Sequence, residues 1–286
     1  MNRVLKSIAL TLGFVCLGAA GEAIAAPAAP AELQCMRLLY GPGYSRPGSV
    51  VQTPDPRGIR VNKPSGYQHM ITEYVTPWKT ATFVLGGTRY FVATGQGHAV
   101  EDPGHPSQAS HAQAAYISAI WFARKAGHWA MVGKEINLSA DGSFGQVVGR
   151  AWTAFPSVTA LRDTVILVAD EGGYMNQGYA VQWFPIYEFT ARGLRALGNV
   201  PSGADNTGSG MKPLISFKGR VTNIGLDAHA RPEISVLFNG RSSVGSRPVA
   251  LHDTRCAFDY VGNPAGSMGR SFETTGPECA AILSNQ

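Results

Sequence analysis

The residues best suited to chemistry in this sequence are imidazoles and carboxylates gathered in one short stretch. His98, His105 and His111 occur there together with Glu101 and Asp102. Neutral imidazole nitrogens and carboxylate oxygens are the ligands that transition metals prefer. The spacing of the three histidines fits no standard zinc motif. The stretch therefore predicts a metal site on these histidines, a binding or catalytic surface without metal, or a solvated polar loop.

A second group of candidate residues lies on a glycine-containing connection between two predicted strands. It contains Asp170, Glu171, Tyr174, Met175 and Gln177. Tyrosine and methionine bury a large area in protein interfaces, and a pair of acids can reach into a positive cleft. Neighbouring side chains of a strand point to opposite faces, so the two acids are not expected to share a proton. We expect these residues to contact another protein; the alternatives are an ordinary hairpin loop or a catalytic acid.

Two further motifs fail on inspection. Ser143 lacks the glycine that a nucleophile elbow needs two residues earlier, since Asp141 stands there. Residues 205–210 have the oxygen-bearing side chains of a calcium loop, but Ser216 replaces the glutamate that would complete it. The sequence therefore identifies no nucleophile and leaves any cofactor unknown.

The first 25 residues have the pattern of a secretory signal peptide. Arg3 and Lys6 precede an apolar run over residues 8–20, and Ala23 and Ala25 are the small residues that a signal peptidase reads. We expect cleavage after Ala25 and export to the periplasm or beyond the cell. No later apolar run reaches the roughly 20 residues of a membrane-spanning helix, so no such segment is expected after cleavage.

The cysteines fit an exported protein. Removal of the signal peptide takes away Cys16 and leaves Cys35, Cys256 and Cys279, which cannot all pair within one chain. Pairing of Cys256 with Cys279 would close a loop of about two dozen residues, which is a stabilising length. The alternative pairs Cys35 with one of the other two.

Composition favours strands and turns. The 286 residues include 34 glycines and 18 prolines, and only 15% are charged, against about 25% in an ordinary domain. The 24 Lys and Arg residues exceed the 19 Asp and Glu residues, for a net charge of +5, but they are scattered singly. Nucleic-acid binders concentrate their basic residues, so nucleic acid is not an expected partner.

Strand signals recur along the chain. Residues 80–85 and 88–93 are β-rich runs joined by two glycines, which predicts a hairpin with a tight turn. A second hairpin is expected from residues 115–122 and 129–138, and 191–197 is a candidate short helix. Further strand-like runs cover residues 164–168, 179–189, 214–222, 233–238 and 248–260.

These signals predict an all-β protein, an antiparallel sandwich or meander with long Gly/Pro-rich loops and little helix. After the signal peptide, residues 26–66 are expected to form an Ala/Pro-rich leader and irregular segment. Residues 67–200 would form the main β domain. Residues 201–286 would form a C-terminal β extension, either separate or part of the same domain.

Rigid strands that present loops are a common way to build a binding surface. The expected function is therefore that of an exported β-rich binding protein, such as an inhibitor or immunity-type protein that blocks another exported protein. The alternative is a secreted hydrolase that acts on polysaccharide or lipid through the His and acid residues of 98–111.

Overall fold

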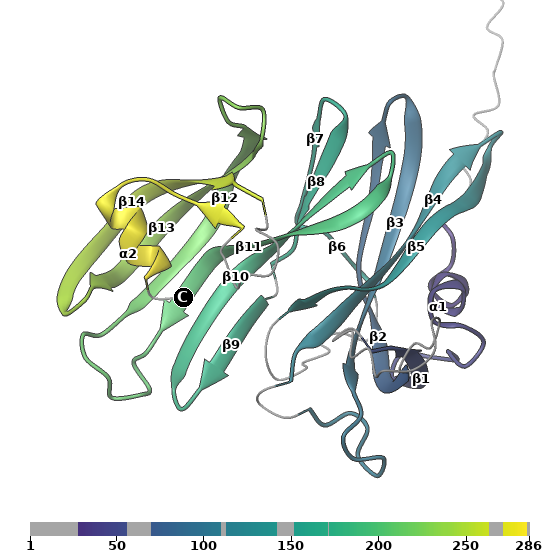
Figure 1. Cartoon of the computed structure of the whole chain (residues 1–286), viewed down its shortest axis with the longest axis horizontal. Helices are drawn as coiled ribbons and strands as arrows, with labels where there is room; N and C mark the ends of the chain where they lie inside the picture. Colours follow the sequence, from purple (N-terminus) through teal and green to yellow (C-terminus); the bar gives the residue numbers. More distant parts are fainter. Residues whose placement is uncertain are drawn as a thin grey trace, which may run out of the picture.

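The computed structural model of the chain describes residues 28–55, 70–109, 113–141, 152–170, 172–262 and 271–284. Within these ranges the protein consists of two mainly antiparallel sheets and two short helices (Figure 1). The predicted all-β antiparallel fold with little helix is confirmed. Neither helix of the described ranges is long and apolar enough to cross a membrane. The signal-peptide residues lie outside the described residues.

Sheet A is built from the first half of the chain. Its strands are β1 (Ser49–Pro54), β2 (Met70–Leu85), β3 (Thr88–Ala99), β4 (Ala115–Lys125), β5 (His128–Asp141) and β6 (Thr153–Ala154). The first five follow each other in space as they do in the sequence, and β6 pairs with β2. Helix α1 (Glu32–Tyr40) packs against one face of this sheet.

Both predicted hairpins of sheet A are confirmed. Leu85 pairs with Thr88 across Gly86 and Gly87, whose φ angles of 55° and 75° belong to the left-handed region that glycine adopts easily. The β4–β5 hairpin turns in the same way between Lys125 and His128. Local turn chemistry therefore sets the register of both strand pairs.

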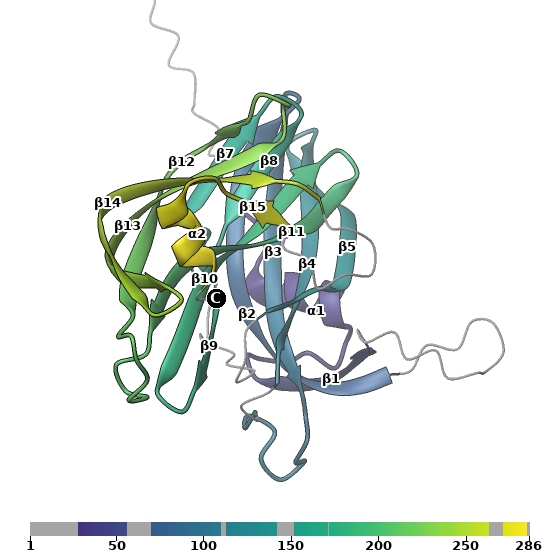
Figure 2. The same cartoon turned by 60° about the vertical axis from the view of Figure 1, so that its left-hand side comes forward.

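Sheet B is built from the second half of the chain. Its strands are β7 (Ser157–Leu161), β8 (Thr164–Val168), β9 (Gly172–Asn176), β10 (Tyr179–Thr190), β11 (Gly193–Asp205), β12 (Ser216–Leu226), β13 (Pro232–Val244), β14 (Arg247–Tyr260) and β15 (Phe272–Glu273). The spatial order is β15-β14-β13-β12-β11-β10-β8-β7, and β9 pairs with β10 beside this path. Figure 2 shows β12 to β14 arching over the short helix α2 (Pro277–Leu283).

Sheet B is buried on both faces where it meets sheet A. Val165 and Leu167 of β8 pack in the core between the two sheets, whereas Ile166 and Val168 pack in a second core under the arch of β12 to β14. This double burial explains why β8 is a continuous apolar run instead of an alternating one. A third core lies between α1 and sheet A.

The disulfide prediction is confirmed. Cys256 of β14 and Cys279 of α2 are bonded, so α2 is covalently attached to the sheet whose core it completes. Cys35 is a free and fully buried thiol on α1. Burial raises the pKa of this thiol to about 12, so it remains protonated and unreactive.

Two local predictions are wrong. The segment 26–66, expected to be irregular, contains α1 and β1. A nine-residue helix has little stability of its own, and α1 depends on Met36 and Leu39 packing on sheet A, which a local pattern does not reveal. Residues 191–197, a candidate helix, instead form the β10–β11 turn and the start of β11. Strand pairing, from Gly193 opposite Thr190 onward, overrides the local helical preference there.

Candidate functional site

Three of the predicted contact residues lie on the β9–β10 hairpin. Tyr174 and Met175 belong to β9, and Gln177 occupies the turn with a positive φ of 49°, followed by Gly178 with a φ of 79°. Tyr174 is 36% exposed and Met175 is 53% exposed. Because neighbouring strand residues point to opposite faces, the two side chains reach solvent on different sides of the hairpin. Glu171 lies outside the described residues.

Strand β9 has an open edge. It lies end to end with β8 along the same side of β10, since Tyr179–Trp183 pair with β9 and Ile186–Phe189 pair with β8. Strand β7 continues the sheet beyond β8 only, and no strand of the described ranges pairs with the outer side of β9 (Figure 1). Open edges of this kind carry unpaired N–H and C=O groups that are ready to pair with another chain.

Asp170, the residue before this hairpin begins, ties it to sheet A. Its carboxylate lies 2.8 Å from the ammonium of Lys79, whose side chain is only 3% exposed while that of Asp170 is 49% exposed. The backbone of Lys79 is held in turn by the Thr94 hydroxyl. This hydroxyl accepts a hydrogen bond from the N–H of Lys79 and donates one to the C=O of Lys79. Asp170 thus has a partner within the chain, so the exposed Tyr174 and Met175 are the better candidates for contact with another molecule.

The turn of the hairpin abuts the loop between β11 and β12. A Cβ atom on Gly178 would lie 2.4 Å from the carbonyl of Gly208, so only glycine permits this approach. Met211, in the same loop as Gly208, is also largely exposed. Three large apolar side chains, Tyr174, Met175 and Met211, are therefore exposed on these two adjoining segments.

The His and acid residues of the segment 98–111 are divided between the interior and the surface. His98 is buried in β3, where its ring packs on Tyr74 at 5.4 Å and its Nε2 lies 3.1 Å from the Pro106 carbonyl. His105 is exposed, and its Nδ1 lies 2.8 Å from an oxygen of Asp102. The hydrogen bond with the His105 imidazole holds the pKa of the Asp102 carboxyl below its usual range.

His111 lies outside the described residues. In the part of the chain that the structure describes, no three His, Cys, Asp or Glu side chains lie close enough to hold a metal ion. A metal site on His98, His105 and His111 thus stays a prediction of the sequence.

Glu73 is a buried titratable residue that the sequence analysis missed. It lies on β2 opposite Val51 and is only 1% exposed. No described group donates a hydrogen bond to its Oε1. Burial raises the pKa of Glu73 to about 7; the Thr53 hydroxyl partly opposes the shift, and the charge of Asp55 adds to it.

The sequence does carry a signal for Glu73. Ile71, Glu73 and Val75 alternate along β2 on one buried face, so an acid stands at a core position of the pattern. A carboxyl that titrates near neutral pH is suited to proton transfer, but Glu73 is closed off between α1 and sheet A. It therefore makes the stability of the fold sensitive to pH.

The candidate site is thus the β9–β10 hairpin, with an open edge, exposed apolar side chains and a base anchored to sheet A. No protein-family model matches the chain, and no significant match is found among curated proteins or among solved structures.

Proposed function

We propose that the mature chain is an exported binding protein that captures another exported protein by strand addition to β9. The observation that carries the proposal is the open outer edge of β9, flanked by the exposed side chains of Tyr174 and Met175. An extended segment of the partner would pair with the free backbone groups of β9. Its side chains would alternate between the two faces and contact Tyr174 on one side and Met175 on the other.

The surroundings of β9 support this role. The ion pair of Asp170 with Lys79 holds the chain just before the strand, and the turn after it is seated against Gly208. A strand held at both ends loses little conformational freedom when it binds, which favours affinity. Such a rigid edge suits an inhibitor or immunity-type protein that inserts its strand beside a segment of another exported protein.

The basic pattern and apolar run of residues 1–25 support export, and the Cys256–Cys279 disulfide fits an oxidising compartment. The partner would then be met in the periplasm or outside the cell.

Substitution of Met175 by lysine tests this proposal. Capture of the partner from the protein's own envelope and secretome by the mature chain, residues 26–286, should weaken about 30-fold or more in Met175→Lys. A lysine on an open edge opposes strand addition, and interface anchors of this kind contribute at least about 2 kcal/mol. Quantitative mass spectrometry of the captured proteins, followed by titration of the identified partner, measures the effect.

Met131→Lys is the matched control, because Met131 is similarly exposed on β5, an edge strand of sheet A. It should bind the partner as the unmodified chain does. Equal binding by Met175→Lys and Met131→Lys would contradict the proposed site.

A secreted hydrolase that acts on polysaccharide or lipid is the second candidate function. The 2.8 Å contact between Asp102 and His105 favours it, because a carboxylate can orient an imidazole for general base catalysis. In that case His105→Ala should abolish hydrolysis of a polysaccharide or ester substrate, whereas His128→Ala, at an exposed histidine of β5, should retain it. Equal turnover by both variants would remove this candidate.

A further inference from the structure

Strands β12, β13 and β14 have one face in the core and one in solvent. Phe217, Val236, Phe238 and Leu251 point inward and are buried. The opposite face, which we name the basic face, carries exposed basic residues from all three strands. They are Lys218, Arg220, Arg241, His252 and Arg255.

Strand register sets the layout of these cations. Arg220 pairs with Leu237, which in turn pairs with Arg255, so the two arginines flank one leucine across three strands. Two strand spacings separate them by about 10 Å. Arg241 lies four residues further along β13 than Leu237, which corresponds to about 13 Å. The charges thus cover a broad, gently curved surface instead of one point.

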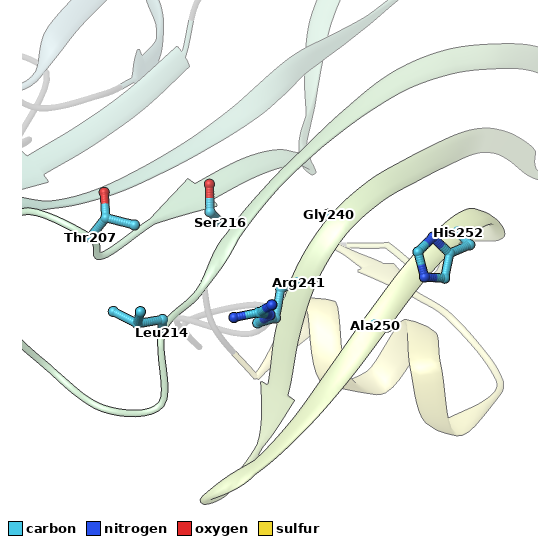
Figure 3. Close-up of a pocket in the computed structure, with 7 residues that line it drawn as sticks. All are labelled: Thr207, Leu214, Ser216, Gly240, Arg241, Ala250 and His252. Atoms are coloured by element: carbon cyan, nitrogen blue, oxygen red, sulfur yellow. The ribbon is translucent and has the colours of Figure 1, made fainter.

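A shallow cavity of about 430 Å³ opens at the Arg241 end of this face. It is lined by Thr207, Leu214, Ser216, Gly240, Arg241, Ala250 and His252. Figure 3 shows the Arg241 side chain between Leu214 on one side and His252 on the other. Arg241 therefore lines the cavity together with the apolar side chain of Leu214 and the imidazole of His252.

Two acids near the cavity, Asp205 and Asp253, accept hydrogen bonds within the fold, whereas Glu233 and Asp259 lie opposite each other in the strand register at the other end of the face. Asp205 accepts hydrogen bonds from the backbone N–H and hydroxyl of Thr207 and from the Ser216 hydroxyl. These bonds hold the pKa of Asp205 below its usual range, and Lys218 adds to the effect. Asp253 accepts a hydrogen bond from the Asn239 amide.

The arginine side chains are not engaged in this way. Across the described ranges, the side chains of Arg220, Arg241 and Arg255 form no hydrogen bond or ion pair with the protein. Their charges remain available to an anionic ligand.

We propose that the basic face binds a linear acidic polysaccharide, with one of its carboxylates held by Arg241 in the cavity. The planar guanidinium forms paired hydrogen bonds with carboxylates, and spread cations fit a polymer that repeats its charge. Strands β12 to β14 present no exposed Phe, Tyr or Trp side chain on this face, and such rings are what nucleic-acid bases stack on in single-strand binders. Val244, at the end of the hairpin, is the only large apolar side chain of β12 to β14 that is strongly exposed, too little for insertion into lipid.

Charge-reversed variants test the proposal. The probe is a fluorescently labelled oligomer of polygalacturonate, and the readout is its anisotropy with the oxidised mature chain at low and at physiological salt. The double variant Arg220→Glu and Arg241→Glu should weaken binding about tenfold or more at low salt, because charge-assisted contacts are lost and repulsion replaces them. The double variant Arg89→Glu and Arg192→Glu, which alters exposed arginines elsewhere by the same total charge, should change it less than about twofold.

Each other outcome overturns the proposal. Equal weakening by the two double variants would show that net charge alone attracts the polymer. Equal binding of neutral dextran would show that charge is not recognised. Binding to phosphatidylglycerol vesicles that exceeds binding to polygalacturonate, and that depends on Arg220 and Arg241, would identify a lipid surface instead. The arginine variants keep Tyr174 and Met175, so a negative result with polygalacturonate does not bear on strand addition to β9. Likewise, unchanged partner capture by Met175→Lys would contradict strand addition to β9 without bearing on the basic face.

Discussion

Above pH 8, Glu73→Gln is expected to raise the free energy of unfolding by about 3 kcal/mol relative to the unmodified chain. The pKa of Glu73 is about 7 in the folded protein, against 4.5 for the ordinary group, because the carboxyl is buried beside β1. Each pKa unit corresponds to about 1.4 kcal/mol of difference between the two protonation states. Glutamine keeps the shape of the side chain and removes the charge whose burial is unfavourable.

Glu73 lowers the free energy of unfolding only at higher pH, because its carboxyl titrates at different pH values in the folded and unfolded states. Below pH 4.5 the carboxyl is protonated in both the folded and the unfolded state, and Glu73 imposes no penalty. Between pH 4.5 and about 7 the unfolded chain releases the proton while the folded chain keeps it, so the stability of the unmodified protein falls as pH rises. Above about pH 7 both states are charged and the full penalty remains.

Urea unfolding at pH 4.5 and at pH 8 measures this difference. Acids with lowered pKa values, such as Asp102 and Asp205, titrate in both proteins, so the difference between the two curves isolates Glu73. Glu135→Gln, at an exposed glutamate of β5, should follow the unmodified chain at both pH values. A gain in Glu73→Gln that is the same at pH 4.5 and pH 8 would show that ionisation of this carboxyl is not its cause.

Removal of the Cys256–Cys279 disulfide is expected to lower the free energy of unfolding by about 3 kcal/mol. The bond joins residues 23 positions apart, and without it the unfolded chain regains the freedom of that loop. Helix α2 would then be held to the sheet by noncovalent contacts alone. These include the packing of Ile282 in the core and the hydrogen bond that Ser242 donates to the Ala281 carbonyl.

The double variant Cys256→Ala and Cys279→Ala, compared with the oxidised chain by urea unfolding, measures the loss. Unmodified protein that has been reduced while unfolded and then refolded with reductant should show a similar loss, whereas reductant should not alter the double variant. Cys35, a buried thiol outside the bond, is present in both proteins. Equal stability of the oxidised and reduced chains would contradict the expected contribution.

Local sequence was sufficient for most of the strands. The glycine pair at 86–87 and the alternating runs around it predicted the β2–β3 hairpin, because turn type and side-chain period are properties of adjacent residues. Residues 170–179 were expected to form a connection between two strands, whereas residues 172–176 form β9. Its open edge was not predicted, because that depends on β7 stopping beside β8.

Other features depended on parts of the chain that are distant in sequence. Helix α1 and strand β1 were missed because packing on sheet A stabilises them more than their own residue preferences do. The sequence places Glu73 at a core position of the alternating pattern of β2. The raised pKa of its carboxyl, however, comes from burial that α1 and β1 help to provide. The ion pair of Lys79 with Asp170 joins residues 91 positions apart, so no local sequence pattern predicts it.

By itself, the sequence determined the β character of the chain, the β2–β3 and β4–β5 hairpins, and a pair of cysteines able to bond. These depend on period, turn residues and spacing, which act over short distances. Only the tertiary structure decided which edge stays open, which carboxyl is buried, and which arginines share a face. Arg220, Arg241 and Arg255 become neighbours through the pairing of β12 with β13 and of β13 with β14. Register and burial depend on contacts between distant segments, and no single stretch of the chain specifies them.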